Sequence, residues 1–316
     1  MCSTALRIAF FLLGVLLVCS IASSRASGQT GTPHRLSAAS AGRAALSARE
    51  ARTLADAWVP PDVDVKAPPV ASSEPCPLPD VLEWAGKRVQ EMVSNLDRFT
   101  SSEFVEHQSV SSGGRLAKVQ TRKFDYVVSI GRAPNGYLSM HEYRSLSPIS
   151  PQFPDRIATE GTPILVLVFH PLYARDFEMN CEGLGDWRGR PAWQVRFEQR
   201  RDRQNRLSNV VVKNHLYGVR LRGRAWILAD SHQVARLETD LADTIPAIKL
   251  RLEHMNVEYQ PVNFPARHVE LWLPSSAELY LDFAERRFYR RHRFTNFTLF
   301  SVDVDQQLAN GTVLAN

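Results

Sequence analysis

The chain contains 316 residues, with 38 Lys and Arg against 33 Asp and Glu, which gives a formal net charge of +5. Removal of residues 1–26, which we expect, takes away Arg7 and Arg25 and leaves 36 − 33 = +3. A surface so weakly basic and so mixed in sign argues against a nucleic-acid partner, but it is compatible with contact to anionic lipid head groups or acidic glycans.

Residues 1–26 have the order of a secretory signal peptide. One positive charge at Arg7 precedes an apolar run, Ile8–Val18, and small polar residues follow from Ser20. The run is much shorter than the roughly 20 residues that a spanning helix needs. We therefore predict cleavage after Ala26, with Ala22 as the second choice, and a periplasmic or secreted mature chain that is soluble after cleavage.

The four cysteines divide between the signal peptide and the mature chain. Cys19 stands where a lipoprotein signal would carry its acylated cysteine, but the preceding Val18 is larger than such a site normally has, so a lipid anchor there is the less favoured alternative. The mature chain keeps Cys76 and Cys181, which favours one disulfide in an oxidising compartment. Two buried free thiols are the alternative.

Residues 27–75 are rich in Ala, Ser, Arg and Pro and have few large apolar side chains. Such a segment buries too little surface to offset the entropy of ordering it, so we expect a disordered spacer. A folded domain over residues 76–305 and a flexible tail over residues 306–316 complete the predicted organisation.

The domain opens with the most regular helical pattern in the chain, Asp80–Phe99. Apolar residues recur there at helical spacing, and Asp80 is placed to cap the first turn. Such a helix has one apolar stripe, which needs a surface to pack against.

Most of the chain after residue 100 alternates between apolar and polar residues, which indicates strands with one dry face and one wet face, as in an antiparallel sheet. Within Lys249–Tyr259 the apolar phase shifts, which predicts a β-bulge near His254. The continuous apolar run Ile164–Phe169 favours a short buried helix over a central strand. We therefore predict a mainly β (α+β) fold, in which a curved antiparallel sheet or half-barrel packs on a long N-terminal helix and one or two short helices.

The motifs of common enzymes are missing from the sequence: there is no nucleophile elbow, zinc-protease helix, phosphate loop or Cys-x-x-Cys pair. His107, His141 and His254 each adjoin an acid, but neighbours on a strand point to opposite faces and cannot share one metal or proton. We predict no catalytic residue, no metal and no cofactor. The basic stretches Arg196–Arg206 and Arg286–Arg293 are interpreted as solvated strand faces and loop, with contact to anionic head groups or glycans as the alternative.

The order of these parts resembles the outer-membrane lipoprotein-sorting carrier superfamily. Four segments carry the resemblance: Val81–Phe99, Gly189–Val195, Ala229–Glu238, and Phe264-Pro265 before a strand ending in Leu273-Pro274. The resemblance implies a periplasmic half-barrel whose apolar concave face holds a greasy ligand, and a lipid or lipoprotein as partner.

We therefore expect an exported carrier or binding protein for a lipid, acylated protein or other amphiphile. The alternatives are an envelope interaction module with a closed core, and a hydrolase whose site is spread over several strands. The residues expected to contact the ligand lie on the dry strand faces: Phe124, Tyr126, Trp193, Phe197, Leu237, Leu279 and Leu281.

Overall fold

The computed structural model describes residues 58–65, 67–71, 75–96, 98–132, 136–145, 153–163, 165–203, 206–213 and 215–300. The expected signal peptide, Cys19, the spacer up to residue 57 and the tail from residue 306 lie outside them. Of the helices in these ranges, none combines the length and the apolar character that a membrane span needs.

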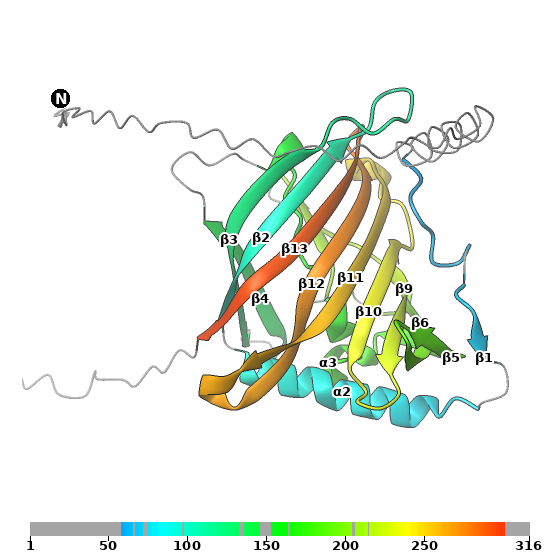
Figure 1. The fold of residues 1–316 in the computed structure, drawn as a ribbon. Coiled ribbons are helices and arrows are strands. Elements are labelled where there is room, and N and C mark those ends of the chain that lie inside the picture. Colours follow the sequence, from blue (N-terminus) through cyan, green and yellow to red (C-terminus); the bar gives the residue numbers. More distant parts are fainter. Residues whose placement is uncertain are drawn as a thin grey trace, which may run out of the picture. The chain divides into compact units, whose positions relative to one another are not determined.

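One open sheet of 11 strands forms the body of the fold, and every neighbouring pair in it is antiparallel (Figure 1). The order across the sheet is β1-β5-β6-β9-β10-β11-β12-β13-β2-β3-β4. The strands are β1 (Val70–Ala71), β2 (Arg98–Ser109), β3 (Gln120–Arg132), β4 (Leu138–Ser145), β5 (Phe177–Trp187), β6 (Arg190–Gln199), β9 (Leu221–Leu228), β10 (Val234–Leu241), β11 (Leu250–Phe264), β12 (Val269–Phe283) and β13 (Arg286–Phe300). A separate hairpin joins β7 (Asn209–Val212) to β8 (His215–Gly218). The predicted mainly β, antiparallel class is confirmed.

The period-two pattern gives the sheet two distinct faces. We call the face that carries Tyr126, Phe197, Leu237 and Val257 the inner face, because these side chains form one large hydrophobic core. The outer face carries Arg224, Asp240 and a small cluster around Trp226. Alternation along each strand therefore decides which residues can meet inside the fold.

The helix expected over Asp80–Phe99 corresponds to α2 (Leu78–Asn95), which lies across one end of the sheet in Figure 1. It differs from the expectation at both ends. Pro77 occupies the N-cap position. Asp80 lies within the first turn, where a negative charge interacts favourably with the helix dipole. Phe99 belongs to β2, because the alternation of that strand has begun by Arg98.

The apolar run Ile164–Phe169 contains η2 (Leu165–Phe169), a buried 3-10 helix rather than a strand. It is followed by α3 (Pro171–Ala174), which begins at a proline because a proline needs no N–H in the first turn. Gly86 of α2 allows the close approach to η2, since a Cβ there would lie 3.0 Å from the Phe169 carbonyl oxygen. The short helices therefore cover the inner face together with α2.

Part of the segment expected to be a spacer is ordered on the outer face, so the folded domain begins before residue 76. Val63 is 1% exposed and its N–H donates to the Asp240 carboxylate at 2.8 Å. Asp64 pairs with Arg196 and with Arg222, at 2.9 and 3.0 Å. A proline-rich segment without a core of its own can be held in place by contacts with the outer face of a sheet. Such contacts cannot be inferred from amino-acid composition.

Cys76 and Cys181 form a disulfide, as the cysteine usage predicted, with their Cα atoms 6.3 Å apart. It ties the segment that leads into α2 to β5. Nearby, β1 adds two residues to the edge of the same strand, where Val70 pairs with Gly185. The disulfide and this short pairing fasten the N-terminal end of the domain to the sheet.

Candidate functional site

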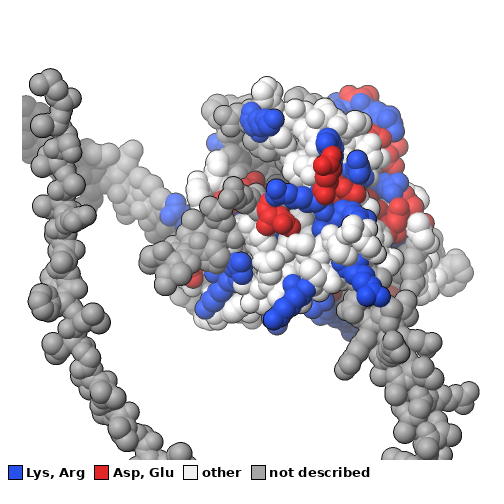
Figure 2. All heavy atoms as spheres, turned by 90° about the horizontal axis from the view of Figure 1, so that it is seen from above, with Lys and Arg blue, Asp and Glu red and all other residues white. Residues whose placement is uncertain are grey.

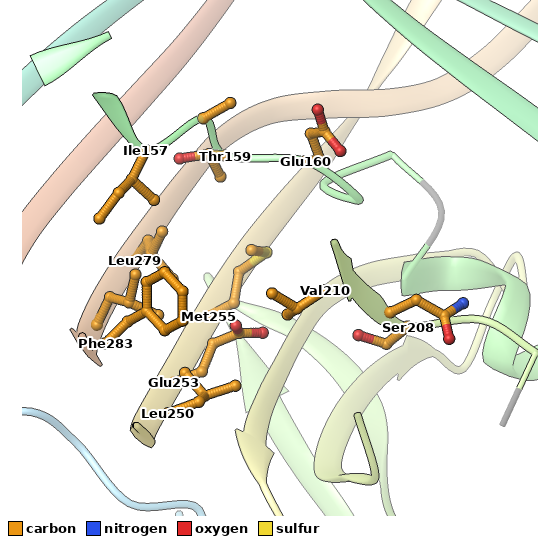
Figure 3. A pocket seen from close by; sticks show the side chains of 13 residues that line it. Ile157, Thr159, Glu160, Ser208, Val210, Leu250, Glu253, Met255, Leu279 and Phe283 are labelled. Carbon is orange, nitrogen blue, oxygen red and sulfur yellow. The ribbon is translucent and has the colours of Figure 1, made fainter. Parts of the chain in front are cut away.

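A cavity of about 300 Å³ lies between the inner face of β11 and β12 and two covering segments, 157–160 and 208–210 (Figure 3). Its apolar wall is formed by Ile157, Val210, Leu250, Met255, Leu279, Leu281 and Phe283. The polar side chains around it are Thr159, Glu160, Ser208, Asn209 and Glu253. We call this space the first cavity.

Strand register and one bulge bring these side chains together. Glu253 pairs with Leu281, and Met255 pairs with Leu279, so all four point to the inner face. The register shifts between Leu250 and Leu252, which keeps Leu250 in the same wall as Glu253 although the two are three residues apart. The predicted phase shift is therefore present, but its bulge precedes His254.

A second cavity of about 450 Å³ adjoins the first and shares Glu160, Ser208, Asn209, Glu253 and Met255 with it. It extends between the ends of β3 and β4 and the start of η2, where its apolar wall consists of Ile130, Leu138, Met140, Leu165 and Leu167. The inner face is therefore only partly filled by the helices and loops that cover it.

Glu253 is the exceptional residue of the cavity wall. Its carboxylate lies among Leu250, Met255 and Val210 in Figure 3, and no residue in the described ranges donates a hydrogen bond to it or pairs with it. Burial among these groups raises the pKa of the Glu253 carboxyl to about 7. The Glu253 side chain can thus change its charge near neutral pH while it faces the first cavity.

Replacing Glu253 by glutamine is expected to stabilise the protein in a pH-dependent way. Between about pH 4.5 and about pH 7 the folded state holds a proton that the unfolded state has lost, so the free energy of unfolding falls as pH rises through this window. The variant should gain up to about 3 kcal/mol at about pH 8 and nothing near pH 4. Urea unfolding at both pH values measures this. Glu270→Gln, an exposed position, should follow the wild type, and an equal gain at both pH values would contradict the ionisation of Glu253.

A buried ionic cluster lies on the inner face beside the first cavity. Glu103 of β2 accepts from the Arg144 guanidinium at 2.6 and 3.0 Å and from His292 Nδ1 at 2.7 Å. Burial alone would raise the pKa of the Glu103 carboxyl, but the hydrogen bonds from His292 and Arg144 outweigh it and lower the pKa. Burial also lowers the pKa of His292. The pair therefore consists of an ionised carboxylate and a neutral imidazole.

Arg290 extends this cluster to the loop that covers the cavity. It is fully buried and donates to the carbonyl oxygens of Ile157 and Pro154, at 2.8 and 3.2 Å, and to Thr159 Oγ1 at 2.7 Å. The Thr159 hydroxyl in turn lies 3.1 Å from His292 Nε2. Because residues 157–160 supply one wall of the first cavity, the cluster positions that wall. The position of Arg290 also corrects the interpretation of Arg286–Arg293 as a wholly solvated face.

A serine, a histidine and an aspartate meet at the edge of this cluster without the geometry of a catalytic triad. The Ser109 hydroxyl and the Asp155 carboxylate both contact His107 Nε2, at 3.2 and 3.0 Å. The other ring nitrogen, Nδ1, accepts from Arg290. A triad needs the serine and the acid on opposite ring nitrogens. Burial, with the nearby Arg290 charge, lowers the pKa of His107 to about 4, so the ring is neutral over most of the pH range.

The seven residues expected to contact a ligand have different positions. Leu279 and Leu281 lie in the wall of the first cavity. Phe124, Tyr126, Phe197 and Leu237 are buried within the fold, and Trp193 is half-buried against the core. Phe197 packs edge to face against Phe169 and Phe177, while Tyr126 donates to Glu142 at 2.6 Å. The structure thus brings two of the seven to the cavity, and the contact role of the others stays a prediction.

Several cavity residues were missed by the sequence analysis, above all Glu253 and Glu160. Glu253 was considered only as the acid next to His254, with which it was not expected to share a metal or a proton. The two do point to opposite faces, as neighbours on a strand must: His254 contacts Asp240 on the outer face at 2.6 Å, and Glu253 faces the cavity. The sequence did contain a signal for this: Glu253 is an acid at the same alternating positions as Met255 and Val257, so it lies on the apolar face of its strand.

Comparisons with known proteins add weak resemblances of the fold. No family model matches the chain, and no curated protein matches it. A DUF1329 family protein from Desulfovibrio piger is similar at a TM-score of 0.38 and 13% identity, over 73% of this chain and 95% of that one. A putative outer membrane lipoprotein-sorting protein domain from Vibrio parahaemolyticus is similar at a TM-score of 0.37 and 9% identity, over 70% and 92%. The second belongs to the group that the sequence resembles.

Basic and acidic side chains are intermixed on the face of the molecule seen in Figure 2. Among the arginines of the basic stretch in β13, Arg291 pairs with Glu278 at 3.1 Å and Arg293 pairs with Glu106 at 3.7 Å. These charges are therefore balanced locally.

Proposed function

We propose that this chain is an extracytoplasmic binding or carrier protein for a lipid, an acyl chain or another amphiphile, held in the first cavity. The single observation that carries the proposal is a cavity on the inner face of an open sheet, with aliphatic side chains along one wall and polar side chains around it. Cavities of about 300 and 450 Å³ lie in the size range of small-molecule sites. The sheet acts in this proposal as a half-barrel around the ligand.

Leu279 and Leu281 would contact the greasy part of the ligand directly. The aromatic residues of the inner face, such as Phe197, would support the wall from behind. The proposal expects three kinds of partner: a lipid, the acyl chains of a lipoprotein, and a membrane surface from which such a ligand is taken.

The extracytoplasmic location rests on the predicted signal peptide and on the disulfide, since disulfides persist in oxidising compartments. We keep cleavage after Ala26 as part of the proposal. N-terminal sequencing and the intact mass of the exported protein test it, and an acylated Cys19 or an uncleaved N-terminus would overturn it.

The binding proposal is tested with the uncharged fluorescent probe N-phenyl-1-naphthylamine. The wild type should bind it with a rise in fluorescence. Val210→Trp places a large side chain into the first cavity from a partly exposed position and should weaken binding by about tenfold or more. Val119→Trp, at an exposed position outside both cavities, is the matched control and should bind like the wild type.

Two results would count against the proposal. If the wild type does not bind the probe, the inner face is a closed core and the chain is an interaction module rather than a carrier. If Val210→Trp binds like the wild type while circular dichroism shows both folded, the probe occupies another site.

A further inference from the structure

We propose that the first cavity selects amphiphiles with a positively charged head group; this rests on the proposed binding function and names its ligand class. The cavity combines an apolar wall, which suits an alkyl chain, with the Glu253 carboxylate, which faces the same space and has no partner among the described residues. A cationic amphiphile satisfies both features at once.

The charge of the wall points to a cation. The first cavity is lined by Glu253 and Glu160 and by no Lys, Arg or His of the described residues, although the chain as a whole carries a net charge of +5. An anionic head group would meet only like charge in this space. A cation would find complementary charge without displacing an existing ion pair.

The groups around Glu253 do not neutralise it. From the covering loop comes Glu160, and β12 contributes only apolar side chains to the wall. The second cavity adds His141, Glu142 and Tyr143 of β4, Tyr173 of α3, and Arg206. Arg206 hydrogen-bonds to the Tyr137 hydroxyl and lies 3.9 Å from Asp176. Arg144 and Arg290 are held within the buried cluster behind Thr159.

A carboxylate without a partner in the described part of the chain is costly in the free protein, because its charged form has lost part of its water and gains no partner there. A ligand cation supplies that partner, and its tail covers the surrounding leucines. Binding should therefore favour the ionised form of Glu253, and the preference for a cation should strengthen as pH rises.

The experiment compares three ligands that share an eight-carbon tail: the cation octyltrimethylammonium, the neutral 1-octanol and the anion octyl sulfate. None of them changes its charge between the two pH values. Isothermal titration calorimetry on the whole mature chain at about pH 8 should show the cation binding about tenfold more tightly than the alcohol, and the alcohol more tightly than the sulfate. The advantage of the cation over the alcohol should shrink about tenfold on lowering the pH to about 5.5, where Glu253 is protonated.

Glu253→Gln keeps the size of the side chain and removes its charge. It should abolish both the preference for the cation over 1-octanol and the pH dependence of that preference. Glu270→Gln is the control and should keep the preference. Equal binding of the three ligands, or tightest binding of the sulfate, would overturn the inference while leaving the proposed function in place. If none of the three binds and N-phenyl-1-naphthylamine does not bind either, the proposed function fails as well.

Discussion

Replacing Glu103 by glutamine is expected to lower the free energy of unfolding by about 3–5 kcal/mol, the usual cost of removing one partner of a buried ion pair. Glu103 is fully buried and is the acceptor for both Arg144 and His292. The amide keeps the shape of the side chain but cannot balance the Arg144 guanidinium. Urea unfolding at neutral pH measures the loss.

The same change should alter the pH dependence of stability. The folded-state pKa of Glu103 is lowered, so its contribution is fully present above about pH 4.5 and is lost as pH falls through the folded-state pKa. The gap between wild type and variant should therefore narrow in acid. Glu106→Gln is the control: this neighbour on β2 lies on the other face, partly exposed, with its arginines at 3.7 Å. It should cost less than about 0.5 kcal/mol. Similar losses for both variants would show that the buried cluster contributes nothing special.

Glu103→Gln should also weaken binding of N-phenyl-1-naphthylamine. The cluster holds residues 157–160 in place through Thr159, and these residues form one wall of the first cavity. If Glu103→Gln has a lower free energy of unfolding but binds the probe like the wild type, residues 157–160 keep their position without the cluster.

Loss of the disulfide is expected to have a similarly large effect. Cys76 and Cys181 are separated by 105 positions, and closing a loop of this length stabilises a protein by up to about 4–5 kcal/mol in the chain-entropy model, with measured values often lower. The Cys76→Ser, Cys181→Ser double variant should therefore unfold at a markedly lower urea concentration than the oxidised wild type.

Reductant provides the internal control for this measurement. Dithiothreitol should lower the stability of the wild type to that of the double variant and should leave the double variant unchanged. The pairing of Val70 and Ala71 with β5 should be weakened most, because β1 has only two residues and depends on the nearby disulfide to stay paired. If the reduced wild type remains as stable as the oxidised protein, the disulfide does not contribute to the fold.

Local sequence patterns predicted the class of the fold because each pattern has a direct physical cause. Alternation along a strand follows from the opposite directions of successive side chains, so the period-two pattern after residue 100 predicted half-buried strands, of which β6 and β3 are examples. The run before Pro171 indicated a buried helix through its prolines, and η2 confirms a helix there. Two cysteines in a mature chain with a predicted signal peptide favoured their pairing, and the disulfide is present.

The sequence by itself therefore determined the mainly β class, the antiparallel sheet and the helix before it, and it favoured the disulfide, since these depend on periodicity, turn residues and cysteine usage. Only the tertiary structure decided which inner-face residues surround a cavity and which fill the core, because that depends on what covers each part of the sheet. Phe197 is covered by Phe169 and Phe177, whereas Leu279 and Leu281, although also buried, line the first cavity. The same reason explains Glu253: alternation gives its face, but loops and strands far away in the chain decide that none of the described residues pairs with it.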